Sequence, residues 1–199
     1  MATNYKKIAD FFFELGLLKR QKHTGPLLAG VTDLNSLADH TVRTATIAYI
    51  LADLEGGVNP EKTGIMCLIH DFPETRTGDH HKVAARYLNT GPAEKKAFLE
   101  QLDALPKKTR ETWLKLYQEK SKRNTPEGIV AQDADWLETA ISAKEFISQG
   151  FPAMQNWIDN VRKALETKSA KELLKVIEKS QPSDWWQGLK KMTYRKLKK

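Results

Sequence analysis

The sequence predicts an all-α fold, and three observations indicate it. Apolar residues recur at helical spacing in several segments, as they do between Ile8 and Leu18. Patterns typical of helix starts, a capping side chain or a proline at the first helical position, occur at Ser36, Asn59 and Thr125. The sequence shows no strand-like alternation of apolar and polar residues, no glycine-rich phosphate loop and no internal repeat.

Length and composition predict one domain. The chain has 199 residues, of which 40% are hydrophobic, which suffices for one substantial core but is cramped for two. We therefore expect a single helical domain over residues 1–180 and a C-terminal helix with a basic tail over residues 181–199. The only cysteine, Cys67, lies in an apolar run and should be a buried core residue rather than a nucleophile. A single cysteine suits a reducing compartment, and the sequence shows no secretory signal and no apolar run of membrane length. We therefore expect a cytoplasmic protein that does not enter a membrane.

The net charge of +7 is concentrated at the C-terminal end. Six basic residues and no acidic ones follow Gln187. Without them the chain has 26 basic and 25 acidic residues, so the body of the protein is close to neutral. Such a tail could contact nucleic acid, an anionic membrane or an acidic partner. We expect a solvated chain end instead, and no nucleic-acid contact through it.

The N-terminal part should begin with an amphipathic helix over residues 5–20, followed by a loop over residues 21–35. Ser36 then caps a helix that is apolar on nearly all sides, and Asp39 stands in the capping-box position three residues after the cap. His40 follows directly. The sequence therefore places this histidine in the first turn of a buried helix.

The next helix begins at residues 59–60, an asparagine followed by a proline. Its apolar run over residues 65–69 leaves no polar face, so this helix should be central. Pro73 should end it, because the proline ring removes a backbone donor and disfavours helical geometry at the preceding residue. Glu74 is therefore expected on a turn just beyond the helix.

Later segments complete an all-helical chain. Asp79 can cap a helix that begins at His80. Asp133 and Asp135 lie two residues apart in one helix and so face different sides. If Asp135 faces a buried site, Asp133 should lie at the surface or behind the residues that form that site. The tryptophan pair at 185–186 is expected to anchor the last helix onto the body. Further helices are expected over residues 93–105, over residues 107–122, from Thr125 onward, and in two or three segments after residue 151.

Candidate metal ligands stand where these helices begin or end. His70 and Asp71 are adjacent at the end of the apolar run, and burying such a pair is costly unless it is hydrogen-bonded or bound to a cation. A metal site needs more ligands than two, and His40 and Asp135 are the imidazole and carboxylate groups that other buried helices offer. The predicted ligand set is His40, His70, Asp71 and Asp135.

This pattern resembles the HD-domain metal-dependent phosphohydrolases, and within them the 5'-deoxynucleotidase-like branch. The resemblance covers about residues 5–150, and the His-Asp-x-Pro-Glu sequence followed by Thr-Gly-Asp is its most specific part. The matching segments are residues 36–40, 70–74, 77–79, 134–138 and 143–146.

The resemblance implies a compact HD-domain helical bundle with additional C-terminal helices. It also implies one divalent ion, Mn, Co, Fe, Ni, Zn or Mg, and a substrate that is a small phosphorylated nucleotide, a (deoxy)nucleoside 5'-monophosphate. Glu74 would transfer a proton in the reaction, and Asp79 would help to orient water or the leaving sugar. A homodimer is expected on the same basis. His80 and His81 raise the possibility of a second metal, but one metal is expected.

One loop departs from the family pattern. Where the branch usually has Arg-Thr-Gly-Trp, whose arginine and tryptophan help to hold the nucleotide, residues 23–26 are His-Thr-Gly-Pro. Arg20 could replace the missing cation, or it could be an exposed arginine at a helix end. Arg43 lies one turn beyond His40 and could bind substrate phosphate, contact a ligand carboxylate, or form a structural salt bridge.

Two alternatives stay open on this sequence. The first is an HD hydrolase of another nucleotide, such as hyperphosphorylated guanosine, for which the usual motif has a second acid where Thr75 stands. The second is a non-catalytic nucleotide-binding protein, which the altered loop at residues 23–26 favours. The presence of all four candidate ligands, together with Glu74, favours the enzyme.

Overall fold

A computed structural model describes residues 4–189, and this part of the chain is all-α, as predicted, with no strand. Most helices are α-helices, and three short elements are 3₁₀-helices, labelled η. In chain order the elements are α1 (Tyr5–Leu15), η1 (Gly16–Lys19), η2 (Gly25–Ala29), α2 (Leu37–Glu55), α3 (Pro60–Ile69), α4 (Glu74–Thr77), α5 (Lys82–Ala85), α6 (Gly91–Leu102), α7 (Lys107–Lys122), α8 (Pro126–Ser148), η3 (Pro152–Met154), α9 (Gln155–Ala164), α10 (Lys168–Lys179) and α11 (Asp184–Gln187).

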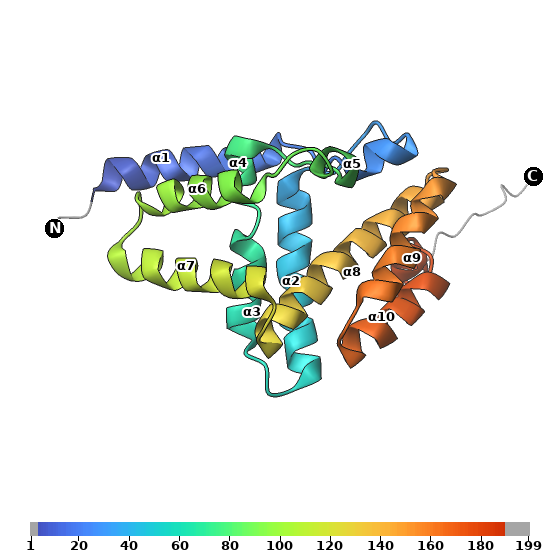
Figure 1. The fold of residues 1–199 in the computed structure, drawn as a ribbon. Helices are drawn as coiled ribbons and strands as arrows, with labels where there is room; N and C mark the ends of the chain where they lie inside the picture. Colours follow the sequence, from blue (N-terminus) through green and yellow to red (C-terminus); the bar gives the residue numbers. More distant parts are fainter. Residues whose placement is uncertain (1–3, 190–199) are drawn as a thin grey trace, which may run out of the picture.

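Helices α2, α3 and α8 pack against one another at the centre of the molecule (Figure 1). Leu51, Met66 and Leu137, one from each helix, are fully buried. Cys67 is also fully buried, and burial raises the pKa of its thiol to about 12, which makes it a core residue as predicted and a poor nucleophile. Helices α9 and α10 cover α8 on one side, while α7 packs on α3 and α8 on the other.

The central helices begin where the sequence predicts. Ser36 and Asp39 form a complete capping box at the start of α2. The Asn59 side chain accepts a hydrogen bond from the Lys62 backbone at the start of α3, and Thr125 caps α8 in the same way. These caps satisfy backbone donors that the first turn would otherwise leave free, so they fix where each helix starts. The positions of the candidate ligands along the chain follow from these starts.

Two predictions about the segment after α3 are wrong in detail. Glu74 is the first residue of the one-turn helix α4 rather than part of a turn, because Pro73 has φ −56° and ψ −29°, values compatible with the residue before a helix. Asp79 does not cap the following helix. That helix, α5, begins at Lys82, and the His81 side chain caps it by accepting a hydrogen bond from the Ala84 backbone.

The C-terminal segments differ from the predictions in two further places. Trp185 and Trp186 are 75% and 48% exposed. The prediction that this pair anchors the last helix, α11, is therefore wrong. Asp133 is fully buried and accepts hydrogen bonds from the backbone of Glu166 and Thr167, which fixes the start of α10 against α8. The basic tail lies outside the described residues, and the domain boundary at residue 180 stays a prediction.

None of the helices in residues 4–189 combines the length and the hydropathy that crossing a membrane requires.

Candidate metal centre

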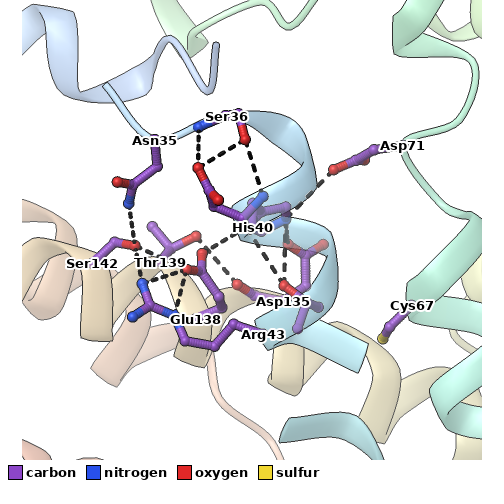
Figure 2. A network of polar contacts seen from close by, with 12 residues as sticks. Asn35, Ser36, His40, Arg43, Cys67, Asp71, Asp135, Glu138, Thr139 and Ser142 are labelled. Carbon is purple, nitrogen blue, oxygen red and sulfur yellow. Dashed lines mark hydrogen bonds and ion pairs between the residues drawn. The ribbon is translucent and has the colours of Figure 1, made fainter. Parts of the chain in front are cut away.

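The structure brings the four predicted ligands together from three helices. His40 lies in the first turn of α2, His70 and Asp71 directly follow α3, and Asp135 lies in α8. Figure 2 shows His40 at the centre of the network with Asp71 and Asp135 facing it. The His40 Nε2 atom lies 3.4 Å from His70 Nε2, 3.5 Å from Asp71 Oδ2 and 3.4 Å from Asp135 Oδ1. His70 Nε2 lies 3.1 Å from Asp71 Oδ1 and 3.8 Å from Asp135 Oδ2.

The separations from the two histidines fit a common cation, and His40, His70 and Asp71 offer ligand atoms that all lie within 4.8 Å of one another. Two nitrogen or oxygen ligands that are each about 2.1 Å from a metal ion and about 100° apart are separated by about 3.2 Å. Three independent helices deliver the donors, and all four side chains are at most 21% exposed. The donor set has mixed nitrogen and oxygen character, which suits a catalytic divalent ion better than a closed structural site.

Both imidazole rings are turned so that Nε2 faces the cluster. His40 Nδ1 donates to Glu138 Oε2 at 2.6 Å, and His70 Nδ1 donates to the Cys67 carbonyl at 2.6 Å. A hydrogen bond of this kind fixes the ring tautomer and leaves the other nitrogen free to bind a metal. Glu138 was not assigned a role from the sequence, although it lies three residues after Asp135 on the same face of a helix, which is the signal that could have identified it.

The cluster is electrostatically adapted to a positive charge. Burial raises the pKa of Asp71 to about 7. Burial alone would lower the pKa of His40, but the hydrogen bonds to Asp135 and Glu138 raise it well above its usual value. The positive charge on His40 in turn holds the pKa of Glu138 at about 2 despite its burial. In the metal-free cluster a proton on His40 therefore supplies charge that a bound cation would otherwise supply.

Arg43 is occupied by carboxylates behind the cluster. Its guanidinium donates to Glu138 Oε1 at 2.7 Å and to Glu145 Oε1 at 2.6 Å, and it also reaches Ser142 Oγ (Figure 2). Of the three roles considered for Arg43, the structure shows a salt bridge, and its partner Glu138 is the residue that holds His40 rather than a candidate metal ligand. A contact between Arg43 and substrate phosphate stays a prediction.

Lys120 is a second charged residue that the sequence did not identify. Its Nζ lies 2.9 Å from Asp135 Oδ2, and the residue is only 9% exposed. Burial would lower the pKa of Lys120, but Asp135 raises it above its usual value, so the ammonium group stays charged. The helical spacing of Leu116 and Lys120 puts the lysine on the buried face of α7, and a cation on such a face could have been noticed in the sequence.

Glu74 and Asp79 flank the cluster in different ways. The Glu74 Oε2 atom is buried and has no hydrogen-bond partner within residues 4–189. Burial and the nearby charges of Asp71 and Asp79 raise the pKa of Glu74 to about 10. Asp79 instead accepts hydrogen bonds from the Thr24 backbone and from Thr24 Oγ1, the latter at 3.0 Å. Asp79 thus ties the divergent loop at residues 23–26 to the segment after α4.

A cavity of about 390 Å³ opens beside the cluster. His23 and Asp79 line the cavity, and the His23 ring lies 4.7 Å from the His40 ring, centroid to centroid. Burial and the proximity of His40 lower the pKa of His23, so it carries no charge at neutral pH and does not replace an arginine. Arg20 is exposed after η1 and does not line this cavity, and its assignment to substrate phosphate stays a prediction.

Glu138→Gln should weaken binding of a divalent metal by about 10–100-fold, because a neutral amide holds the His40 ring less firmly than the carboxylate does. Calorimetric titration of the chelator-treated protein with Mn²⁺ measures the affinity. Glu145→Gln is the matched control, since Glu145 contacts Arg43 but not His40. If Glu138→Gln binds Mn²⁺ with the affinity of the wild type, the orientation of His40 does not depend on this contact.

Comparisons with known proteins agree with this geometry. A family profile described as "HD domain" matches residues 15–178. The chain is 30% identical over 149 residues to 5'-deoxynucleotidase HDDC2 of Dictyostelium discoideum, covering 70% of this chain and 77% of that protein. It is 26% identical over 155 residues to 5'-deoxynucleotidase YfbR of Escherichia coli, covering 72% and 76%. Among solved structures, a conserved hypothetical protein from Pyrococcus furiosus superimposes with a TM-score of 0.72 at 31% identity, over 86% of this chain and 99% of that one.

Proposed function

The chain belongs to the HD-domain family, and from this premise we propose that it is a metal-dependent phosphohydrolase that removes phosphate from (deoxy)nucleoside 5'-monophosphates. The observation that carries the proposal is the convergence of His40, His70, Asp71 and Asp135 beside Glu74, whose buried Oε2 atom has no hydrogen-bond partner within residues 4–189. The names of the relatives from Dictyostelium and Escherichia coli support the substrate class.

The four clustered side chains would hold one divalent cation. When bound, such a cation lowers the pKa of water and neutralises negative charge that develops on the phosphoryl oxygens. Glu138 and the Cys67 carbonyl hold the two imidazole rings in place, so the donor atoms need little rearrangement. The buried positions of these residues exclude bulk water from the site, which strengthens each electrostatic interaction there.

Glu74 is the residue suited to proton transfer. Burial and the charges of Asp71 and Asp79 raise its pKa to about 10 in the metal-free site, so the carboxyl group is protonated there at neutral pH. A carboxyl group in this position can give or take a proton during the reaction. We propose that Glu74 protonates the sugar 5'-oxygen as the bond from phosphorus to that oxygen breaks, while water adds to phosphorus. One hydrogen of the water stays on the released phosphate, and the other returns to Glu74 as a proton. Asp79, held by Thr24 at the edge of the cavity, would orient the sugar.

Phosphate release from a panel of ribo- and deoxyribonucleoside 5'-monophosphates tests the proposal, with Mn, Co and Mg supplied in turn. The wild type should release phosphate with at least one metal, and His70→Ala, assayed in parallel, should not. A wild-type protein with a loaded metal site that releases no phosphate from any of these compounds would contradict the proposed substrate class.

Homodimerisation and a cytoplasmic location remain proposals that accompany this function. Both rest on the family resemblance and on composition. Light scattering on the eluting peak of a size-exclusion column would measure the mass in solution, and a mass near the 22.6 kDa of one chain would contradict the dimer.

A further inference from the structure

Helix α9 presents one face to the cavity beside the metal cluster. Its residues Asn156, Trp157, Asn160, Val161 and Ala164 line the cavity, and their spacing is that of one helical face. Figure 1 shows α9 next to α8, the helix that carries Asp135. His23, which lies beside His40, lines the same cavity, so the cavity connects the side of the metal cluster to a wall on α9. Neither the candidate ligands nor Glu74 contribute to that wall.

The two ends of the cavity differ in charge. Outside α9 the lining includes the ionisable residues Asp79 and Lys82 and three histidines, one of which, His23, lies beside His40. Along α9 it includes only neutral side chains, and the carboxamides of Asn156 and Asn160 make no hydrogen bond to another residue within 4–189. A ligand with a charged group at one end and a neutral ring with polar edges at the other matches this arrangement.

Trp157 closes the cavity against the loop that departs from the family pattern. A Cβ atom placed on Gly25 would lie 3.5 Å from Trp157 Nε1, so the indole edge and this loop are in ordinary contact distance. The loop itself offers no large aromatic ring, since residues 23–26 are His-Thr-Gly-Pro and the His23 ring packs against the His40 ring. Trp157 is half-buried, so part of its surface remains open to a ligand.

We propose that α9 forms the nucleobase subsite of this enzyme, with the Trp157 indole as the stacking surface and Asn156 and Asn160 as hydrogen-bond partners of the base edge. A flat heterocycle gains affinity by stacking on an aromatic side chain. Carboxamides both donate and accept hydrogen bonds, which is what the edge of a nucleobase requires. The inference rests on the proposed function, because it places the 5'-phosphate at the metal cluster.

The test compares deoxyadenosine 5'-monophosphate with 2-deoxyribose 5-phosphate, which has the same sugar and phosphate but no base. For Trp157→Ala, the ratio of kcat/KM for the nucleotide to kcat/KM for the sugar phosphate should fall at least about tenfold. Trp185→Ala removes a 75% exposed indole that lies outside the cavity lining and serves as the control, with an unchanged ratio. An unchanged ratio for Trp157→Ala would overturn the subsite.

A second variant tests the edge contacts without removing a large side chain. Asn160→Asp replaces an amide by a group that only accepts hydrogen bonds, so the order of kcat/KM among the four deoxynucleotides should change, by about tenfold for at least one base. The same order as in the wild type would show that Asn160 does not contact the base.

Direct binding separates failure of this inference from failure of the proposed function. If the wild type releases phosphate from neither compound, equilibrium dialysis with deoxyadenosine still reports on the subsite. Binding that Trp157→Ala weakens at least about tenfold would support the subsite while the proposed reaction fails. Equal binding by wild type and variant, or no binding by either, would overturn the subsite itself.

Discussion

Glu74→Gln should lower the rate of phosphate release by about 10²–10⁴-fold and leave the metal content of the protein unchanged. The reason is that Gln has nearly the same shape but cannot give a proton to the leaving sugar oxygen. Steady-state kinetics on the best nucleotide of the panel, together with metal analysis of the same sample, measures both effects. Glu61→Gln makes the same chemical change on the exposed first turn of α3 and should be without effect.

The same variant should raise stability, which separates lost chemistry from lost folding. Glu74 has a pKa of about 10 in the folded metal-free protein and an ordinary value near 4.5 when unfolded. Between these values the folded state binds one more proton than the unfolded state, so the free energy of unfolding falls as pH rises. Gln removes this penalty. Metal-free Glu74→Gln should therefore melt at a higher temperature than the wild type at pH 7, with the difference shrinking toward pH 4.

Loss of metal by Glu74→Gln would show that Glu74 is a ligand, and wild-type turnover would show that it is not the acid.

Asp71→Ala should abolish stoichiometric metal binding and reduce phosphate release to background. Asp71 is the carboxylate whose two oxygens face both histidines, at 3.5 Å from His40 Nε2 and 3.1 Å from His70 Nε2. Without it the site loses the ligand that bridges α2 and the end of α3. Metal analysis of the purified variant after incubation with Mn²⁺ measures the effect, and Asp53→Ala, an exposed carboxylate on α2, is the control. An unchanged metal content would sink the assignment of Asp71 as a ligand.

Local sequence signals were sufficient to place the four candidate ligands on their helices. The caps at Ser36, Asn59 and Thr125 fix the helix starts, and a backbone cap depends only on residues a few positions apart. The structure brings the four side chains together, while their role as metal ligands stays a prediction. The prediction of a turn at Glu74 failed because proline is compatible with the residue before a helix as well as with a helix end.

The residues that the sequence did not assign depend on contacts between distant segments. Lys120 contacts Asp135, which is 15 residues away in the sequence, and Glu138 contacts His40, which is 98 residues away. These contacts form only when α7 and α8 pack against the cluster. Trp157 borders the cavity because α9 folds back over α8. The opposite error occurred at Trp185 and Trp186. An aromatic pair predicted burial, but no helix within residues 4–189 packs over them enough to cover either ring.

Titration of the chelator-treated protein with Mn²⁺, with phosphate release from a nucleoside 5'-monophosphate recorded at each addition, tests the central claim most directly. If His40, His70, Asp71 and Asp135 hold a single catalytic ion, we expect no release without metal, a rise with each addition, and a plateau at one equivalent per chain. Undiminished release from the chelator-treated protein before any metal is added would contradict it.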